Sequence, residues 1–346
     1  MKMQTLPFAV LLAVALGCRA GEEPGSFPTL RGEYLGQPAP GSEPELFAPG
    51  IVSTGIYTRD IAMTPGGDEI YYGVMIGPFS VIMQTKLEDG RWTEPEVAPF
   101  SANPGYLNLE PHISPDGQRF FFLSNRPAEG GELEPGQAGR WVNQDIWVMD
   151  RTADGWGEPY NLGPPVNTSD EEYFPSVTSD GTIYFSRQPS GSQESYIYRS
   201  RFVDGAYQPV ELLPPQVNST TVQFNAFIAP DESYLILTVF GRDDSLGNAD
   251  YYIVFRNRDD DWSEPINLGD AVNTAGGGEW SPFVTRDDRY FFFMSSRTRP
   301  SESFPETLTA EFLWQAHESP QNGEADIYWM DASFIDELRP PEFGTF

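Results

Sequence analysis

Residues 110–126 have the sequence Glu110-Pro-His-Ile-Ser-Pro-Asp-Gly-Gln-Arg-Phe-Phe-Phe-Leu-Ser-Asn-Arg126. A Ser-Pro-Asp-Gly turn separates two short apolar segments here, which is the pattern of a β-hairpin. The same pattern returns four more times along the chain, most weakly in the first copy. The other copies begin at Asp60, Phe174, Asn225 and Ser281.

Two further strand signals follow each hairpin. The third is short and apolar, as in Asp145-Ile-Trp147, and the fourth closes the unit, as in Glu158-Pro-Tyr-Asn-Leu-Gly-Pro-Pro-Val-Asn-Thr168. Four strands in each repeat of this length predict the blades of a β-propeller. The turn positions Gly66, Asp116, Asp180, Asp231 and Asp287 lie 50, 64, 51 and 56 residues apart.

The fifth unit lacks a fourth strand signal, and the missing piece lies at the front of the chain. Residues 43–54 match the pattern of the closing strand. We therefore predict an all-β fold, a single five-bladed β-propeller of four-stranded blades over residues 43–346, closed by the N-terminal strand. A six-bladed ring with one degenerate blade is the alternative.

The start of the chain has the pattern of a secretory signal. Lys2 precedes an apolar run from Leu6 to Leu16, which is too short to span a membrane. The sequence Ala15-Leu16-Gly17-Cys18 resembles a bacterial lipobox. The resemblance implies a signal peptide over residues 1–17 and lipid on Cys18, the only cysteine. A signal peptide that is cut elsewhere is the alternative.

Residues 18–42 are rich in Gly, Pro, Glu and Ser, which predicts a flexible linker between the anchor and the propeller. We expect an exported protein, held in the bacterial envelope by its lipid anchor alone. Arg19 follows the cysteine where an Asp would favour the inner membrane, so the lipobox resemblance implies the outer membrane.

The formal net charge is −30. A surface this acidic repels nucleic acid and anionic lipid head groups, so we expect neither as a partner. It is compatible with basic proteins, neutral sugars and cations. Solubility alone also explains it.

The repeat resembles the PD40 type, the WD40-like repeat of TolB-like propellers. Ser114-Pro-Asp-Gly117 and Asp145-Ile-Trp147 carry the likeness, which extends over about residues 43–331. The resemblance implies a propeller with an envelope or binding role. It does not specify an activity, because propellers carry many functions.

In a propeller, the loops and turns that connect the strands lie on two opposite faces. The longer loops, including residues 127–144 and 298–325, share one face, which we call the loop face, while the Pro-Asp-Gly turns share the other, the turn face. We expect function on the loop face and a structural role for the turn face. The candidate ligand-binding residues are Glu110, Glu172, Glu279 and Asp60, the arginines Arg126, Arg187, Arg242 and Arg297, and Trp280. Structural pairing of the arginines with Asp145, Asp250 and Asp326 is the alternative.

Motifs of other chemistries are missing from the sequence. It has no His-Glu-x-x-His, no cysteine cluster and no Gly-x-Ser-x-Gly, so we predict no metal and no cofactor. Of the two histidines, His112 lies in a predicted strand, where packing explains it.

These observations favour a non-enzymatic propeller that binds a protein or a carbohydrate through the loop face. The alternative is a glycan-active enzyme, which would use two of the carboxylates as acid and as base or nucleophile. A purely structural envelope protein is a third possibility.

Overall fold

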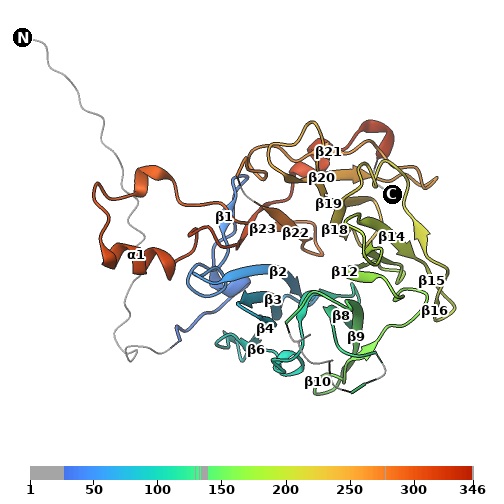
Figure 1. The fold of residues 1–346 in the computed structure, drawn as a ribbon, viewed down its shortest axis with the longest axis horizontal. Helices are drawn as coiled ribbons and strands as arrows, with labels where there is room; N and C mark the ends of the chain where they lie inside the picture. Colours follow the sequence, from blue (N-terminus) through green and yellow to red (C-terminus); the bar gives the residue numbers. More distant parts are fainter. Residues whose placement is uncertain (1–26, 129, 132, 134–138, 277, 345–346) are drawn as a thin grey trace, which may run out of the picture.

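The computed structural model describes residues 27–344 except 129, 132, 134–138 and 277. Five small antiparallel sheets are arranged around a central axis (Figure 1). The protein is thus a five-bladed β-propeller, and the prediction of the fold class is confirmed. The signal peptide and Cys18 lie outside the described residues.

Each blade has four strands, which follow one another outward from the axis. Blade I contains β2 (Tyr57–Met63), β3 (Glu69–Ile76), β4 (Phe79–Glu88) and β6 (Glu96–Val97), with β5 (Arg91–Trp92) also paired to β4. Blade II contains β7 (Asn108–Ile113), β8 (Arg119–Ser124), β9 (Asp145–Thr152) and β11 (Tyr160–Asn161), with β10 (Gly155–Trp156) also paired to β9. Blade III contains β12 (Glu171–Val177), β13 (Ile183–Gln188), β14 (Tyr196–Ser200) and β17 (Glu211–Leu212), and β15 (Phe202–Val203) with β16 (Ala206–Tyr207) forms a separate hairpin. Blade IV contains β18 (Gln223–Ile228), β19 (Tyr234–Phe240), β20 (Ala249–Phe255) and β21 (Ile266–Asn267).

Blade V joins the two ends of the chain. It contains β22 (Glu279–Val284), β23 (Tyr290–Ser295), β24 (Asp326–Asp331) and the N-terminal β1 (Glu45–Leu46). Strand β1 runs antiparallel to β24, with Leu46 opposite Tyr328. The Ser53 hydroxyl donates to the Ile327 carbonyl across 3.0 Å, and Phe47 is fully buried beside β1. The predicted closure by the N-terminal strand is confirmed, and the six-bladed alternative is wrong.

The repeated turn has a local physical cause. In the β7–β8 turn, the Arg119 N–H donates to the Ser114 hydroxyl across 2.9 Å, and the Gln118 N–H donates to the Asp116 carboxylate across 3.0 Å. Gly117 has a φ of +71°, which a residue without Cβ adopts at little cost. The turn is therefore specified by side chains within a few residues of it.

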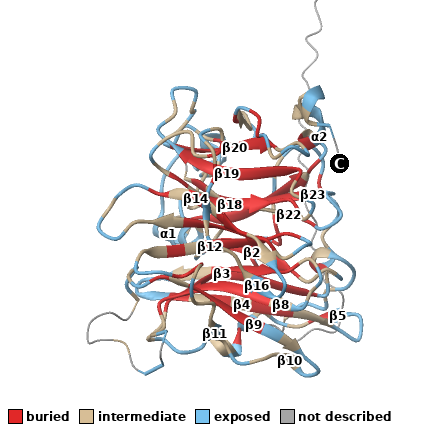
Figure 2. Cartoon of the chain, turned by 90° about the vertical axis from the view of Figure 1, so that its right-hand side faces the viewer, coloured by how far each residue is buried: buried red, intermediate tan, exposed pale blue. Residues whose placement is uncertain are grey.

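Aromatic side chains fill the space between blades, and the buried strands stack through the molecule (Figure 2). Tyr251 of blade IV packs against Phe291 and Phe293 of blade V, with ring centroids 6.0 Å apart in both pairs. Full burial of such a side chain stabilises the fold by roughly 1.5–3 kcal/mol. Many of the aromatic residues, which make up 14% of the sequence, thus lie in the core.

The segment that precedes β1 also packs on the propeller. The Trp92 indole N–H donates to the Gly32 carbonyl across 2.7 Å, and Leu35, in the 3₁₀ turn η1 (Tyr34–Gly36), is buried. The Asp331 N–H donates to the Gly41 carbonyl across 2.8 Å. Residues 30–41 therefore contact the propeller.

The longest insertion projects from the ring between β23 and β24. It contains η3 (Ser301–Ser303) and α1 (Ala310–His317), whose first turn is capped by the Thr309 hydroxyl (Figure 1). A second helix, α2 (Phe334–Leu338), packs its Ile335 into the core. In the part of the chain that the structure describes, no helix has the length and apolar character needed to cross a membrane.

Candidate functional site

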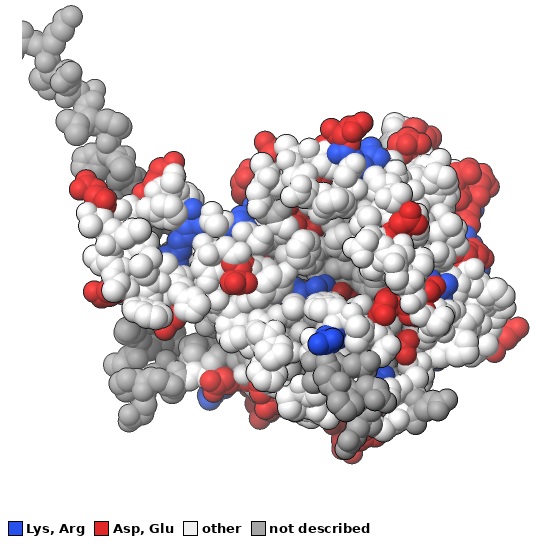
Figure 3. All heavy atoms as spheres, viewed as in Figure 1, with Lys and Arg blue, Asp and Glu red and all other residues white. Residues whose placement is uncertain are grey.

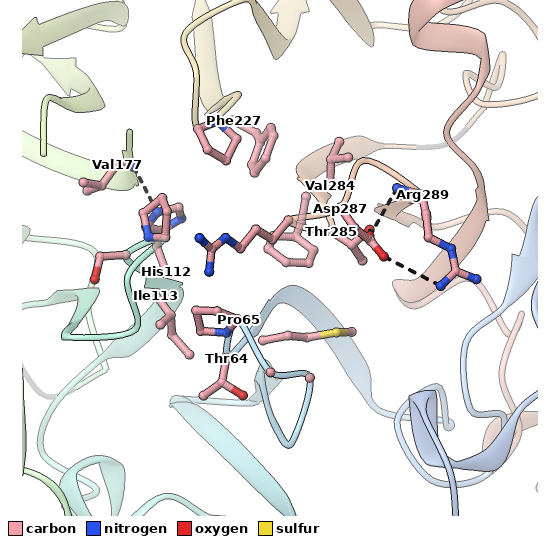
Figure 4. Close-up of a pocket in the computed structure, with 18 of the residues that line it drawn as sticks. Thr64, Pro65, His112, Ile113, Val177, Phe227, Val284, Thr285, Asp287 and Arg289 are labelled. Carbon is pink, nitrogen blue, oxygen red and sulfur yellow. Dashed lines mark hydrogen bonds and ion pairs between the residues drawn. The ribbon is translucent and has the colours of Figure 1, made fainter. Parts of the chain in front are cut away.

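A cavity of about 400 Å³ opens on the turn face, at the centre of the ring (Figure 4). We call it the turn-face cavity. Its walls come from the first hairpins of blades I, II, IV and V and from the end of β12 in blade III. The apolar lining consists of Met63, Pro65, Ile113, Pro115, Val177, Phe227, Ile228, Pro230, Phe283 and Val284. This volume and this lining are typical of a ligand site.

His112 lies in the wall of the turn-face cavity. The Val177 N–H donates to its Nε2 across 2.9 Å, so the neutral ring carries its proton on Nδ1 (Figure 4). Burial lowers the pKa of His112 to about 4, and the bond from Val177 uses the lone pair that a second proton would need. Nδ1 makes no hydrogen bond to a described residue, and the side chain lies almost completely buried in the cavity wall. The ring therefore presents a free hydrogen-bond donor.

Charged side chains line the same cavity. Asp287 accepts from the Thr285 hydroxyl across 2.7 Å and lies 3.7 Å from the Arg289 guanidinium. Arg286 is exposed and forms no ion pair or side-chain hydrogen bond with any residue that the structure describes. The cavity thus combines apolar walls with the neutral His112, the unpaired cation of Arg286 and the carboxylates of Glu33 and Asp287. The turn face, expected to be structural, therefore carries a candidate site.

The five innermost strands share an irregularity that the sequence did not predict. Each contains a β-bulge, and the bulged residue has a positive φ although it is not glycine. Such a backbone costs of order 1–3 kcal/mol, so the surrounding structure must hold it. The five bulge residues are Asp60, Glu110, Phe174, Asn225 and Ser281.

The bulge residues form a buried polar network at the axis. Arg59 donates from Nε to Asp60 and from Nη2 to Glu110, each across 2.8 Å. Glu110 also accepts from the Phe174 N–H across 2.7 Å, while Ser281 donates to Asp60 and accepts from Asn225. Burial raises the pKa of Glu110 to about 7, against the opposing effect of the Arg59 guanidinium. Two of the predicted site residues, Asp60 and Glu110, are brought together here.

Glu172 and Glu279 occupy a different position from Glu110. Glu172 is the second residue of β12 and Glu279 the first of β22, and each lies two residues before the bulge, where the neutral Asn108 stands in blade II. Glu172 accepts from the Thr168 N–H across 2.9 Å and pairs with Arg187 at 2.8 Å. Glu279 accepts from the hydroxyls of Thr274 and Ser295. Glu110 therefore does not correspond to Glu172 and Glu279, and it stands at the bulge position that Phe174 and Ser281 hold in their blades, as the alignment of the repeats has it.

Three of the four predicted arginines make one repeated contact. Each donates to a backbone carbonyl of the connection that enters its own blade and stacks on an aromatic ring of the third strand. The pairs are Arg126 with Phe100 O and the Trp147 ring, Arg187 with Val166 O and the Tyr198 ring, and Arg297 with Val272 O and the Tyr328 ring. Arg242 instead pairs with Asp244 at 2.9 Å and stacks on Tyr252.

The alternative of pairing with the third-strand aspartates is wrong. Asp145 accepts from the Asn161 amide across 2.7 Å, and Asp326 accepts from the Gln321 N–H across 2.6 Å. Asp250 accepts from two backbone N–H groups and from Asn267. Burial raises the pKa values of Asp145 and Asp326 to about 6. These aspartates hold their own loops.

Trp280 is half-buried on β22, directly before the bulge of blade V. Its ring lies 6.3 Å from that of Phe224, and its indole nitrogen has no hydrogen-bond partner in the described part of the chain. The same position holds Arg59 in blade I and Leu109, Tyr173 and Phe224 in blades II, III and IV. Arg59 is the residue that sequence reasoning missed, although a single arginine at a position otherwise apolar or aromatic was the available signal.

No metal centre is formed by the residues that the structure describes, since they contain no group of three or more His, Cys, Asp or Glu side chains placed to hold an ion.

Acidic atoms are spread over the face with α1, with few basic atoms between them (Figure 3). This distribution agrees with the charge of −30.

The fold places the protein in the class of five-bladed β-propellers, and comparison with known proteins gives no narrower class. No family model matches the chain, and no curated protein matches it. Similar solved structures include TolB from Acinetobacter baumannii, with 14% sequence identity and a TM-score of 0.43. The match covers 80% of this chain and 57% of the TolB chain. They also include an endo-arabinanase from Bacillus licheniformis, with 12% sequence identity and a TM-score of 0.42. This match covers 80% of this chain and 93% of the arabinanase chain. This chain thus spans little more than half of TolB, and the PD40 resemblance stays a prediction.

Proposed function

We propose that this protein is an exported, lipid-anchored binding protein of the bacterial envelope, and that it binds a peptide segment of a partner protein in the turn-face cavity. The supporting observation is the combination in one cavity of about 400 Å³ of apolar walls, the neutral His112 and the unpaired Arg286. The apolar walls suit an aliphatic or aromatic side chain, and Arg286 suits a neighbouring carboxylate.

A carbohydrate is less suited to the turn-face cavity. Its lining includes ten apolar residues, three of them prolines. A sugar surrounded by such walls would lose hydrogen bonds to water without replacing them. We therefore favour a protein partner over a glycan for this site.

The alternative of a glycan-active enzyme has less support. Glu110, Glu172 and Glu279 are buried, and each accepts hydrogen bonds from groups of the fold. Such contacts suit structural carboxylates. Replacing all three with Gln distinguishes catalytic from structural carboxylates. If they were catalytic, the triple variant would lose turnover and stay folded. We expect instead that the triple variant melts at a much lower temperature.

Selection of displayed random peptides on the purified protein tests the proposal. We expect the bound peptides to carry an apolar residue next to Asp or Glu. Arg286→Glu should weaken their binding at least ten-fold by reversing the charge. Arg258→Glu is the matched control, because Arg258 is also exposed and has no ion pair within the described structure. Equal binding by Arg286→Glu and the wild type would overturn the proposal.

A further inference from the structure

A second cavity, of about 550 Å³, lies between blades I and II, away from the turn-face cavity. We call it the inter-blade groove. It runs between β4 and the 3₁₀ turn η2 (Pro99–Ser101) on one side and β9 with β10 on the other. Four aromatic side chains line it, together with amides and both signs of charge. The lining residues used below are Gln84, Lys86, Phe100, Asn103, Tyr106, Arg126, Trp147, Asp154, Trp156 and Glu158.

The guanidinium of Arg126 is incompletely satisfied in this groove. Nη2 donates to the Phe100 carbonyl, whereas Nε and Nη1 have no hydrogen-bond partner in the described structure. No described carboxylate lies within 4.0 Å of Arg126, and burial lowers the pKa of Arg126 to about 10. Arg126 is half-buried, and only the more distant Glu158 carboxylate among the described residues acts on its charge, so the site favours an added anion.

The sister blades show which partner is missing. Arg187 in blade III makes the same carbonyl contact as Arg126 and also pairs with Glu172 at 2.8 Å. In blade V the equivalent of Glu172 is Glu279, next to Arg297. In blade II this position is Asn108, which is fully buried and carries no charge. The carboxylate is therefore absent in the blade that borders the inter-blade groove.

Lys86 adds a second cation to the groove. Its ammonium forms no ion pair with any described residue, and it is the only lysine apart from Lys2. Asp154 and Glu158 also line the groove and are suited to accept hydrogen bonds from hydroxyl groups. The amides of Gln84 and Asn103 can donate and accept.

We propose that the inter-blade groove binds a sugar that carries a carboxylate, with the carboxylate at Arg126 and Lys86 and the apolar face of the ring against Tyr106 and Trp156. The hydroxyl groups lie toward Asp154, Glu158 and the amides. This ligand supplies the negative charge that the neutral Asn108 lacks, and it matches a lining that contains cations, carboxylates and aromatic rings. The site is separate from the turn-face cavity and does not depend on the peptide proposal.

Titration of the purified protein with sodium glucuronate, followed by tryptophan fluorescence, tests the proposal. Methyl glucoside and sodium acetate at the same ionic strength are the probes that lack the carboxylate or the sugar. We expect glucuronate to bind at millimolar concentration and each of the other two at least ten-fold more weakly. An equal fluorescence response to glucuronate and acetate would overturn the proposal. So would the lack of a response to glucuronate at 50 mM, a concentration roughly ten times the dissociation constant of a weak sugar site.

Two variants and one control locate the site. Arg126→Gln should weaken glucuronate binding at least ten-fold. Asn108→Glu should do the same by supplying an internal counter-ion, and it should raise the melting temperature, because blades III and V accommodate Glu at this position. Arg297→Gln, which removes the sister arginine of blade V, should bind glucuronate like the wild type. Unchanged binding by both Arg126→Gln and Asn108→Glu would contradict the assignment, and Asn108→Glu keeps it testable if Arg126→Gln fails to fold.

Discussion

The Nη2 atom of Arg59 lies 2.8 Å from Oε1 of Glu110, and these two residues belong to the innermost strands of neighbouring blades. Both are almost completely buried, as is Asp60, the other carboxylate that Arg59 contacts. One cation therefore neutralises charge from two blades at the propeller axis. Such a group is held in place by all of its partners at once, since none can turn toward water.

Replacing Arg59 with Met should destabilise the protein by about 3–5 kcal/mol, because two carboxylates would remain buried without their cation. Unfolding in urea measures the change. Arg119→Met is the control, since Arg119 and Asp150 lie 3.8 Å apart near the surface and exposed pairs contribute about 0–1 kcal/mol. Similar losses in the two variants would show that the axial network contributes little.

Stability should fall in acid through His112. Its folded pKa of about 4 lies below the unfolded value of 6.5, so the unfolded state takes up a proton first as the pH drops. The loss begins near pH 6.5 and is complete near pH 4. The difference of about 2.5 units corresponds to an upper bound of about 3 kcal/mol.

His112→Gln removes this titration and should flatten the difference in unfolding free energy between pH 6.5 and pH 4. Its amide can still accept from the Val177 N–H, the bond that the imidazole accepts in the wild type. His317→Gln changes an exposed residue of α1 and serves as the matched control. Parallel pH profiles for the wild type and His112→Gln would rule out a contribution from His112.

The closure of the ring by β1 should be sensitive to Phe47. This side chain is fully buried against Phe292 and Trp329, with ring centroids 5.1 and 5.3 Å away. Phe47→Ala should cost about 3–5 kcal/mol of unfolding free energy. Ile56→Ala, at a residue that is 40% exposed, should cost far less in the same urea titration. A small loss for Phe47→Ala would mean that the ring closes without this segment.

The lipid anchor is tested at Cys18. Labelling of cells with a fatty acid should mark the wild-type protein and not Cys18→Ser, and the variant should leave the membrane fraction, because the acyl chains supply the attachment. Cleavage at another position would leave both proteins unlabelled and equally soluble.

Much of the architecture was predictable because its causes are local. Ser114, Asp116 and Gly117 specify their turn within four residues of sequence, and equivalent turns recur at blade spacing. The missing fourth strand and its match at residues 43–54 then predicted the closure that β1 makes with β24. A repeated pattern identifies a blade even when single positions vary.

The arrangement at the axis was not predictable from the repeat. The alignment of the repeats places Glu110 with Phe174 and Ser281, but it does not reveal that these residues form bulges at the axis, two residues after Asn108, Glu172 and Glu279. A positive φ at a non-glycine residue is imposed by packing and by contacts to other blades, so local sequence does not reveal it. The two cavities have the same origin, because residues far apart in the chain line each of them.

The sequence by itself thus determined the all-β class, the five blades and the order in which their strands follow, since turn chemistry and alternation act over a few residues. Only the tertiary structure decided that Arg59 neutralises Glu110, that Arg126 pairs with no carboxylate of the described residues and that the turn face carries a cavity. These are relations between blades. They depend on how five similar units meet around an axis, which the sequence of one unit does not contain.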